Sequence, residues 1–123
     1  MKPKENDIIT IVGGGLSGPV MAMYLAKHGF KVHVYERRPD IREQKISAGR
    51  SINLALSKRG IFALQDIGVF EKIKPLLIPM YGRQIHDLDG TTRLLPYGNA
   101  GQFINSVSRS ELNKILITES EQT

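Results

Sequence analysis

Three glycines and one acid near the start of the chain have the spacing of a nucleotide-binding turn. Gly13, Gly15 and Gly18 fit the pattern G-x-G-x-x-G, and Glu36 follows 18 positions after the last of them. Gly13 permits a tight turn after a strand, Gly15 lets the backbone approach a pyrophosphate, and Gly18 lets a helix pack closely. The Glu36 carboxylate would accept hydrogen bonds from both ribose hydroxyls and would repel a 2′-phosphate. These residues therefore predict a site for FAD or NAD rather than NADP.

The neighbours of these four residues extend the predicted site. Leu16 and Ser17 open the helix after the turn, whose N-terminal N–H groups and dipole favour anionic phosphates. Arg37 and Arg38 follow Glu36 and are the one tight basic cluster, which could serve a phosphate. The alternative is a Gly-rich turn that binds nothing, and the surrounding strand, helix and acid argue against it.

The elements that position these residues form a βαβ unit. Residues 8–12 are an apolar run that predicts a buried parallel strand, and residues 31–35 predict the second strand. Between them, residues 16–27 predict a helix that ends at Gly29. Residues 36–49 are polar and predict a long surface loop. The predicted fold class is α/β, with a Rossmann-like FAD/NAD(P)-binding βαβ unit.

The middle of the chain predicts one extended segment and two helices. Residues 50–56 look extended. Ser57 predicts the N-cap of a helix through about Ile67, with Gly68 ending it. Residues 69–77 predict a second short helix, broken near Pro75 and Pro79.

The last third predicts a hairpin, a strand and a helix. Residues 83–88 and 92–97 predict two strands around Asp89-Gly90, which is a strong hairpin signal. Residues 103–107 predict a further extended segment. Ser108 has the spacing from Glu111 of a capping box, which predicts a last helix that runs to about residue 121.

Composition narrows the class of protein. The chain has 123 residues, at most one ordinary domain, and a net charge of 17 − 12 = +5 with scattered cations, which argues against nucleic acid as a partner. It has no cysteine, and His28, His33 and His86 form no ligand cluster, so no metal site is predicted. No apolar run resembles a signal peptide or a membrane span. We expect a cytoplasmic protein, with membrane association only through a further C-terminal part.

Four segments, in this order and spacing, resemble the FAD-dependent aromatic hydroxylases, and within them the members that act on L-kynurenine. The segments are IVGGGLSG (11–18), GRSINLALS (49–57), IPMYGRQIH (78–86), and LPYG with SVSR (95–98 and 106–109). The resemblance implies FAD as cofactor, NADPH as co-substrate and O₂-dependent hydroxylation of L-kynurenine to 3-hydroxykynurenine, a step of tryptophan catabolism. It also implies that the flavin carries the chemistry, without a catalytic acid–base residue of the protein.

The resemblance also assigns roles to single residues. Arg83 and Tyr97 match the pair that holds the amino-acid carboxylate of the substrate, which suits a guanidinium fork and a phenol. Positions that match cofactor contacts in the family are Gly13, Gly15, Leu16, Ser17, Gly18, Glu36, Arg37, Arg38, Ala55 and Arg109.

The geometry of the hairpin tests the substrate pair independently. A two-residue turn at Asp89-Gly90 would place Arg83 and Tyr97 on opposite faces. A three-residue loop over 88–90 would place both on one face, and such loops favour glycine at their last position. We therefore predict the three-residue loop, or a bulge near Pro96.

The sequence contains only the first two strands of a doubly wound sheet, so we expect an incomplete, N-terminal part of an FAD-binding domain over 1–123. Within it, 1–57 would be the dinucleotide-binding unit and flavin loop, 58–107 the helices and a hairpin on the substrate side, and 108–123 a returning helix. Later family motifs that complete the FAD and NADPH contacts have no counterpart here, so the chain alone should be inactive. Two alternatives remain: another FAD-dependent hydroxylase or oxidoreductase, or a non-catalytic nucleotide-binding fragment.

Overall fold

The βαβ unit forms as predicted in the computed structural model, which describes residues 7–43 and 52–123. Strand β1 (Ile8–Val12) pairs in parallel with β2 (Lys31–Tyr35), and helix α1 (Ser17–Lys27) connects them. Gly29 ends the connection with a φ of 85°, a left-handed conformation that glycine adopts without strain. The α/β class and the Rossmann-like unit are thus confirmed.

These two strands do not enclose a core by themselves. Val12 is 87% exposed and Tyr35 is 60% exposed, although residues 8–12 are an apolar run typical of a buried strand. Among the described residues, α1 is the helix that packs against β1 and β2, and no third strand joins their parallel sheet.

A second sheet is antiparallel and has three strands. Strand β7 (Ile104–Ser108) lies in the centre, between β3 (Asn53–Leu56) and β4 (Ile78–Met80). The sequence did not predict β4, because Pro79 was interpreted as a break. The structure places Pro79 in an edge strand that pairs only with β7, where the missing N–H of proline is tolerated.

The helices follow the prediction with small differences. Helix α2 (Lys58–Asp66) begins after Ser57, but the Ser57 side chain makes no capping hydrogen bond. The predicted helix over 69–77 is two short pieces, α3 (Phe70–Ile73) and the 3₁₀ helix η1 (Lys74–Leu76). Pro75 lies in the first turn of η1, where no backbone N–H is needed.

The core lies around helix α4 (Arg109–Ser120), which packs against α1 and α3. Ile73 is fully buried, and Leu116 and Val107 are 1% and 2% exposed. The other buried members of this apolar cluster are Met23, Leu64, Val69 and Leu112.

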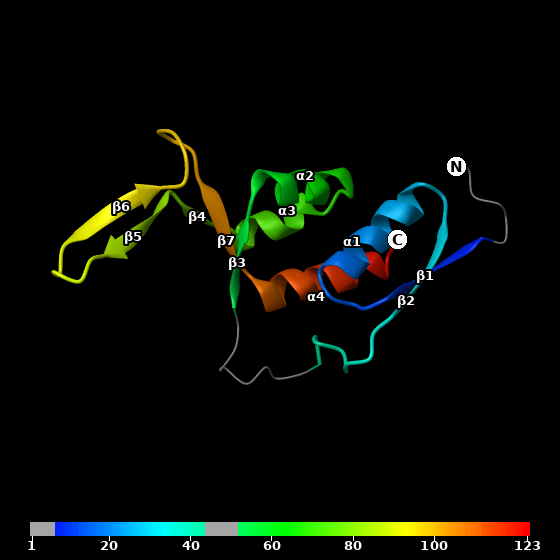
Figure 1. The fold of residues 1–123 in the computed structure, drawn as a ribbon. Coiled ribbons are helices and arrows are strands. Elements are labelled where there is room, and N and C mark those ends of the chain that lie inside the picture. Colours follow the sequence, from blue (N-terminus) through cyan, green and yellow to red (C-terminus); the bar gives the residue numbers. More distant parts are fainter. Residues whose placement is uncertain (1–6, 44–51) are drawn as a thin grey trace.

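The hairpin projects from one end of the molecule (Figure 1). It consists of β5 (Gly82–His86) and β6 (Thr92–Pro96), which form a two-stranded sheet of their own. In Figure 1 the β3–β7–β4 sheet separates this hairpin from the βαβ unit at the opposite end. In the described ranges, no helix has the length and apolar character needed to cross a membrane.

Candidate functional site

The Gly-rich turn is bound to the end of β2. Gly13 has a φ of 116°, which an L side chain rarely adopts. Its N–H donates a 2.7 Å hydrogen bond to the carbonyl of Tyr35, the last residue of β2. The turn is therefore fixed beside the position where Glu36 leaves the strand.

The other two glycines of the pattern meet different surroundings. A Cβ on Gly18 would lie 1.9 Å from the carbonyl oxygen of Gly13, so only glycine fits there. The sequence assigned Gly18 to contact between helix and sheet, whereas its tightest neighbour is the turn itself. A Cβ on Gly15 would have no heavy atom within 4 Å, which leaves open space beside the turn for a phosphate.

The Glu36 carboxylate is held in place by N–H donors of Gly14 and Arg38. The N–H of Gly14 donates to Oε2 at 2.7 Å, and the N–H and Nε of Arg38 donate to Oε1 at 2.8 and 3.0 Å. These bonds, first of all the one from the Arg38 side chain, lower the pKa of Glu36 to about 2. The side chain is 27% exposed, so it is a fixed, ionised acceptor that a ribose can reach.

Gly14 is a site residue that the sequence analysis missed. Besides its bond to Glu36, it is buried, and a Cβ there would lie 3.0 Å from the Glu36 Cβ. The run of three consecutive glycines was the available signal, because the pattern G-x-G-x-x-G explains only the first and third of them.

The remaining residues predicted near the turn differ in exposure. Ser17 is exposed at the start of α1, and Arg37 is exposed after β2. The Leu16 side chain packs against the hydrophobic core, so only its main chain is placed to meet a phosphate. Arg38 makes a salt bridge to Glu36 at 3.0 Å, so its guanidinium already has an anionic partner.

Ala55 lies in the central antiparallel sheet, and Arg109 directly follows its middle strand, β7. Ala55, in β3, is opposite Ser106 of β7, and Asn53 is opposite Ser108. Arg109 follows directly as the first residue of α4, and both Ala55 and Arg109 are exposed. The pairing of β3 with β7 thus brings Ala55 to the strand that leads into Arg109. Positions 49–51 of the GRSINLALS segment lie outside the described residues.

The hairpin has the predicted three-residue loop. The main-chain N–H of Asp87 donates a 2.9 Å hydrogen bond to the carbonyl of Thr91, and Gly90 has a φ of 85° at the last loop position. Arg83 pairs with Leu95 in the ladder, so Tyr97, two residues further on, shares its face. The prediction of a shared face is confirmed, and Tyr97 is 43% exposed.

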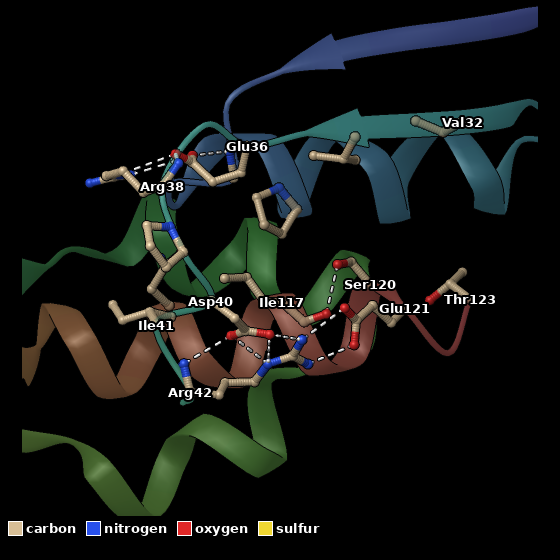
Figure 2. A pocket seen from close by; sticks show the side chains of 15 residues that line it. Val32, Glu36, Arg38, Asp40, Ile41, Arg42, Ile117, Ser120, Glu121 and Thr123 are labelled. Atoms are coloured by element: carbon tan, nitrogen blue, oxygen red, sulfur yellow. Dashed lines mark hydrogen bonds and ion pairs between the residues drawn. The ribbon is translucent and has the colours of Figure 1, made fainter. Parts of the chain in front are cut away.

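A cavity of about 650 Å³ lies between β2, the segment after Glu36, and α4 (Figure 2). Its walls include Val32 and Val34 of β2 and Ile117 of α4. Asn113 also lines it, and its Oδ1 is the one buried side-chain polar atom in the described ranges without a hydrogen-bond partner. No local sequence pattern predicts this cavity, because it forms between segments about 80 residues apart.

The cavity is also lined by an ion-pair network. Two of its residues, Asp40 and Arg42, belong to the segment that the sequence predicted only as a polar surface loop. The guanidinium of Arg42 lies between the carboxylates of Asp40 and Glu121. By contrast, no group of three or more His, Asp or Glu in the described ranges could hold a metal ion.

Comparisons with known proteins agree with the Rossmann-like fold. A family model described as an NAD(P)-binding Rossmann-like domain matches residues 11–57. The kynurenine 3-monooxygenase of Cytophaga hutchinsonii is 52% identical over 115 residues, which are 92% of this chain and 26% of that protein. The protein of the same name from Sus scrofa is 50% identical (93% and 24% covered), and that from Myxococcus xanthus is 44% identical (100% and 27% covered). The chain spans about a quarter of the length of these curated relatives.

Solved structures support the fold. The p-nitrophenol 4-monooxygenase of Pseudomonas putida DLL-E4 superposes with a TM-score of 0.69 at 17% identity, over 94% of this chain and 30% of that one. A peptidyl tryptophan dihydroxylase gives a TM-score of 0.59 at 19% identity, over 93% and 23%. The resemblance noted in the sequence is thus confirmed: over nearly its whole length the chain is similar to kynurenine 3-monooxygenases.

Proposed function

We propose that this chain forms the N-terminal part of an FAD-dependent monooxygenase that hydroxylates L-kynurenine to 3-hydroxykynurenine with NADPH and O₂. The observation that carries the proposal is the identity of 44–52% with relatives of that name, which extends over 92% or more of the chain. It includes the hairpin, which lies outside the 11–57 segment common to nucleotide-binding proteins.

At the cofactor end, the proposal assigns the pyrophosphate to the turn and the adenosine ribose to Glu36. The open space beside Gly15 and the N-terminus of α1 suit an anionic diphosphate. The Leu16 main chain and the Ser17 side chain would add donors there, and Arg37 would lie toward the adenosine. Arg38 would act mainly through Glu36, because its guanidinium already bonds that carboxylate.

The flavin portion of FAD would lie beside the central antiparallel sheet. Ala55 would contact the flavin portion of FAD, and Arg109 would supply a cation to the same cofactor. When bound, FAD would supply the redox chemistry that activates O₂, and the protein would position the ring to be hydroxylated.

At the substrate end, Arg83 and Tyr97 would bind the carboxylate of L-kynurenine. A guanidinium offers two parallel N–H donors to a carboxylate, and a phenol adds one more. Their common face on the hairpin permits both to reach the same anion. This is the geometry that a two-residue turn would have prevented.

These assignments give each of three segments of the chain a separate role. We propose that 1–57 holds the dinucleotide and the flavin loop, that 58–107 serves the substrate side, and that 108–123 returns to the cofactor domain. Since β1 and β2 leave apolar side chains exposed, we expect this chain on its own to be inactive. The absence of cysteine suits a reducing compartment, and we place the enzyme in the cytoplasm.

The test is kynurenine-stimulated NADPH oxidation in the presence of FAD, with 3-hydroxykynurenine followed by chromatography. It should be run on this chain and on the longest natural protein that contains it. We expect activity only in the longer protein. If that protein is folded and loaded with FAD yet does not respond to kynurenine, the substrate assignment is wrong, and another FAD-dependent hydroxylase or oxidoreductase becomes the better description.

A further inference from the structure

The C-terminal end of α4 carries negatively charged side chains, which the helix dipole disfavours. Its last residues include Glu119, and Glu121 follows at the C-cap, while no basic residue lies in the last turn. The helix dipole places partial negative charge at this end, so carboxylates there are unfavourable and cations are favourable. Cations for this end must come from other elements.

Arg42 supplies one of these cations. Its Nη1 and Nη2 donate to the two carboxylate oxygens of Glu121 at 2.6 and 2.8 Å, a bidentate arrangement (Figure 2). Its Nη1 also lies 3.4 Å from Thr118 Oγ1. The segment after β2 is thereby fastened to the end of α4.

Asp40 completes the network from the other side. Nε of Arg42 donates to both Asp40 oxygens, at 2.9 and 3.0 Å, and the Arg42 main-chain N–H donates to Oδ1 at 2.9 Å. These bonds lower the pKa of Asp40 to about 2, and the bond from Arg42 also lowers the pKa of Glu121. All three groups are therefore charged at neutral pH.

The segment between Glu36 and Arg42 is thus fastened at both ends. At one end Glu36 accepts a hydrogen bond from Gly14 of the turn, and at the other Arg42 is bonded to α4. Only five residues separate these two anchors, so the chain between them has little freedom to move when both hold. Release of the Arg42 anchor would let the segment shift, and Glu36 is part of it.

We propose that Arg42, held by Asp40 and Glu121, is a positioning residue that orients the Glu36 carboxylate toward the ribose of a bound dinucleotide. The inference rests on the proposed cofactor site. Arg42 would not itself contact the ribose, because its guanidinium bonds Asp40 and Glu121. It acts through the backbone of the segment that forms one wall of the cavity in Figure 2.

The test uses the longest natural protein that contains this chain, with FAD bound. ADP and 2′-deoxy-ADP are each titrated as competitors of FAD, because they differ only in the 2′-hydroxyl, one of the two ribose hydroxyls that Glu36 would bind. We expect the unchanged protein to prefer ADP by about tenfold, the scale of one hydrogen bond to a charged group. In Arg42→Gln and Glu121→Gln that preference should fall to about twofold or less, because a displaced Glu36 carboxylate no longer accepts a hydrogen bond from the 2′-hydroxyl.

Lys72→Gln is the matched control. Lys72, in α3, forms a 2.6 Å salt bridge to Glu119 near the C-terminal end of α4. Replacement of Lys72 therefore removes the same charge as Arg42→Gln but leaves the segment after β2 unchanged. The preference for ADP should stay at its original value in this variant. A reversed pair, Arg42→Glu with Glu121→Arg, should recover a large part of the preference.

Two results would overturn the inference. One is an unchanged preference in Arg42→Gln and Glu121→Gln while Glu36→Gln abolishes it. The other is an equal loss of affinity for ADP and 2′-deoxy-ADP, which would mark Arg42 as merely structural. If the unchanged protein itself shows no preference or does not bind FAD, the proposed cofactor site is wrong instead.

Discussion

Arg83 and Tyr97 share one face of the β5–β6 hairpin, one diagonal step apart in the ladder. Arg83 lies opposite Leu95, and the N–H of Tyr97 donates a 3.0 Å hydrogen bond to the carbonyl of Tyr81, which continues the same register beyond β6. Diagonal neighbours on one face are close enough for long side chains to reach a common partner. The relationship is a consequence of the three-residue loop that ends at Gly90.

Replacement of either residue should weaken binding of kynurenine in the longer protein. Arg83→Gln should raise KM about 10- to 100-fold, the scale of hydrogen bonds to a charged group, and Tyr97→Phe about threefold to tenfold. Since both would bind one carboxylate, the double variant should be less impaired than the product of the two effects. Steady-state kinetics with varied kynurenine measure all three.

Gln84→Ala is the control for these variants, because Gln84 points to the opposite face of the same strand. Its KM should stay within about twofold of the original value, as expected for an exposed surface change. An increase in KM as large as that of Arg83→Gln would show that kynurenine binding depends on the hairpin as a whole rather than on the face that carries Arg83 and Tyr97.

The hairpin also shows what sequence could and could not predict. Loop length and strand parity are local, so the register followed from a few residues around Gly90. The strand at Pro79 was missed because an edge strand depends on a distant partner, β7. For the same reason the pairing of Arg42 with Glu121, 79 positions away, had no local sign.

The glycines of the turn should separate stability from cofactor binding. Gly18→Ala places a methyl 1.9 Å from the Gly13 carbonyl, a backbone clash that should destabilise the fold by at least about 1–3 kcal/mol. Gly15→Ala meets nothing within 4 Å and has no positive φ, so stability should change by less than about 0.5 kcal/mol.

The affinity for FAD should distinguish Gly15→Ala from an ordinary surface substitution. Gly15→Ala should bind FAD less tightly although it stays folded, because its methyl fills the space that the pyrophosphate needs. Thermal unfolding and fluorescence titration of FAD in the longer protein measure the two properties. Normal FAD affinity in Gly15→Ala would argue against a pyrophosphate at this turn.

The charge of Glu36 should persist to low pH. Its pKa is lowered from 4.5 to about 2, so the stabilisation it contributes is fully present above pH 4.5 and is lost as the pH falls toward 2. FAD binding should therefore show no titration of Glu36 between about pH 5 and 8. Because the Arg38 side chain is the largest cause of the shift, Arg38→Gln should move this pKa back toward 4.5.

A carbon-13 NMR titration of the Glu36 carboxyl group checks the prediction directly. The comparison variant is Arg37→Gln, since Arg37 is exposed and makes no contribution to the lowered pKa of Glu36. A Glu36 pKa that is unchanged in Arg38→Gln would mean that the backbone donors, including Gly14, hold the carboxylate without the guanidinium.

The two serines predicted to cap helices should differ in their contribution to stability. Ser108 accepts a hydrogen bond from the N–H of Glu111 at 3.4 Å, whereas Ser57 makes no side-chain capping bond to α2. Ser108→Ala should therefore lower the free energy of unfolding by about 0.5–1 kcal/mol, at the low end for an N-cap because the bond is long. Ser57→Ala should cost less than about 0.5 kcal/mol. Denaturant unfolding of both variants measures the difference, and an equal or larger cost at Ser57 would contradict this account of how the two helices begin.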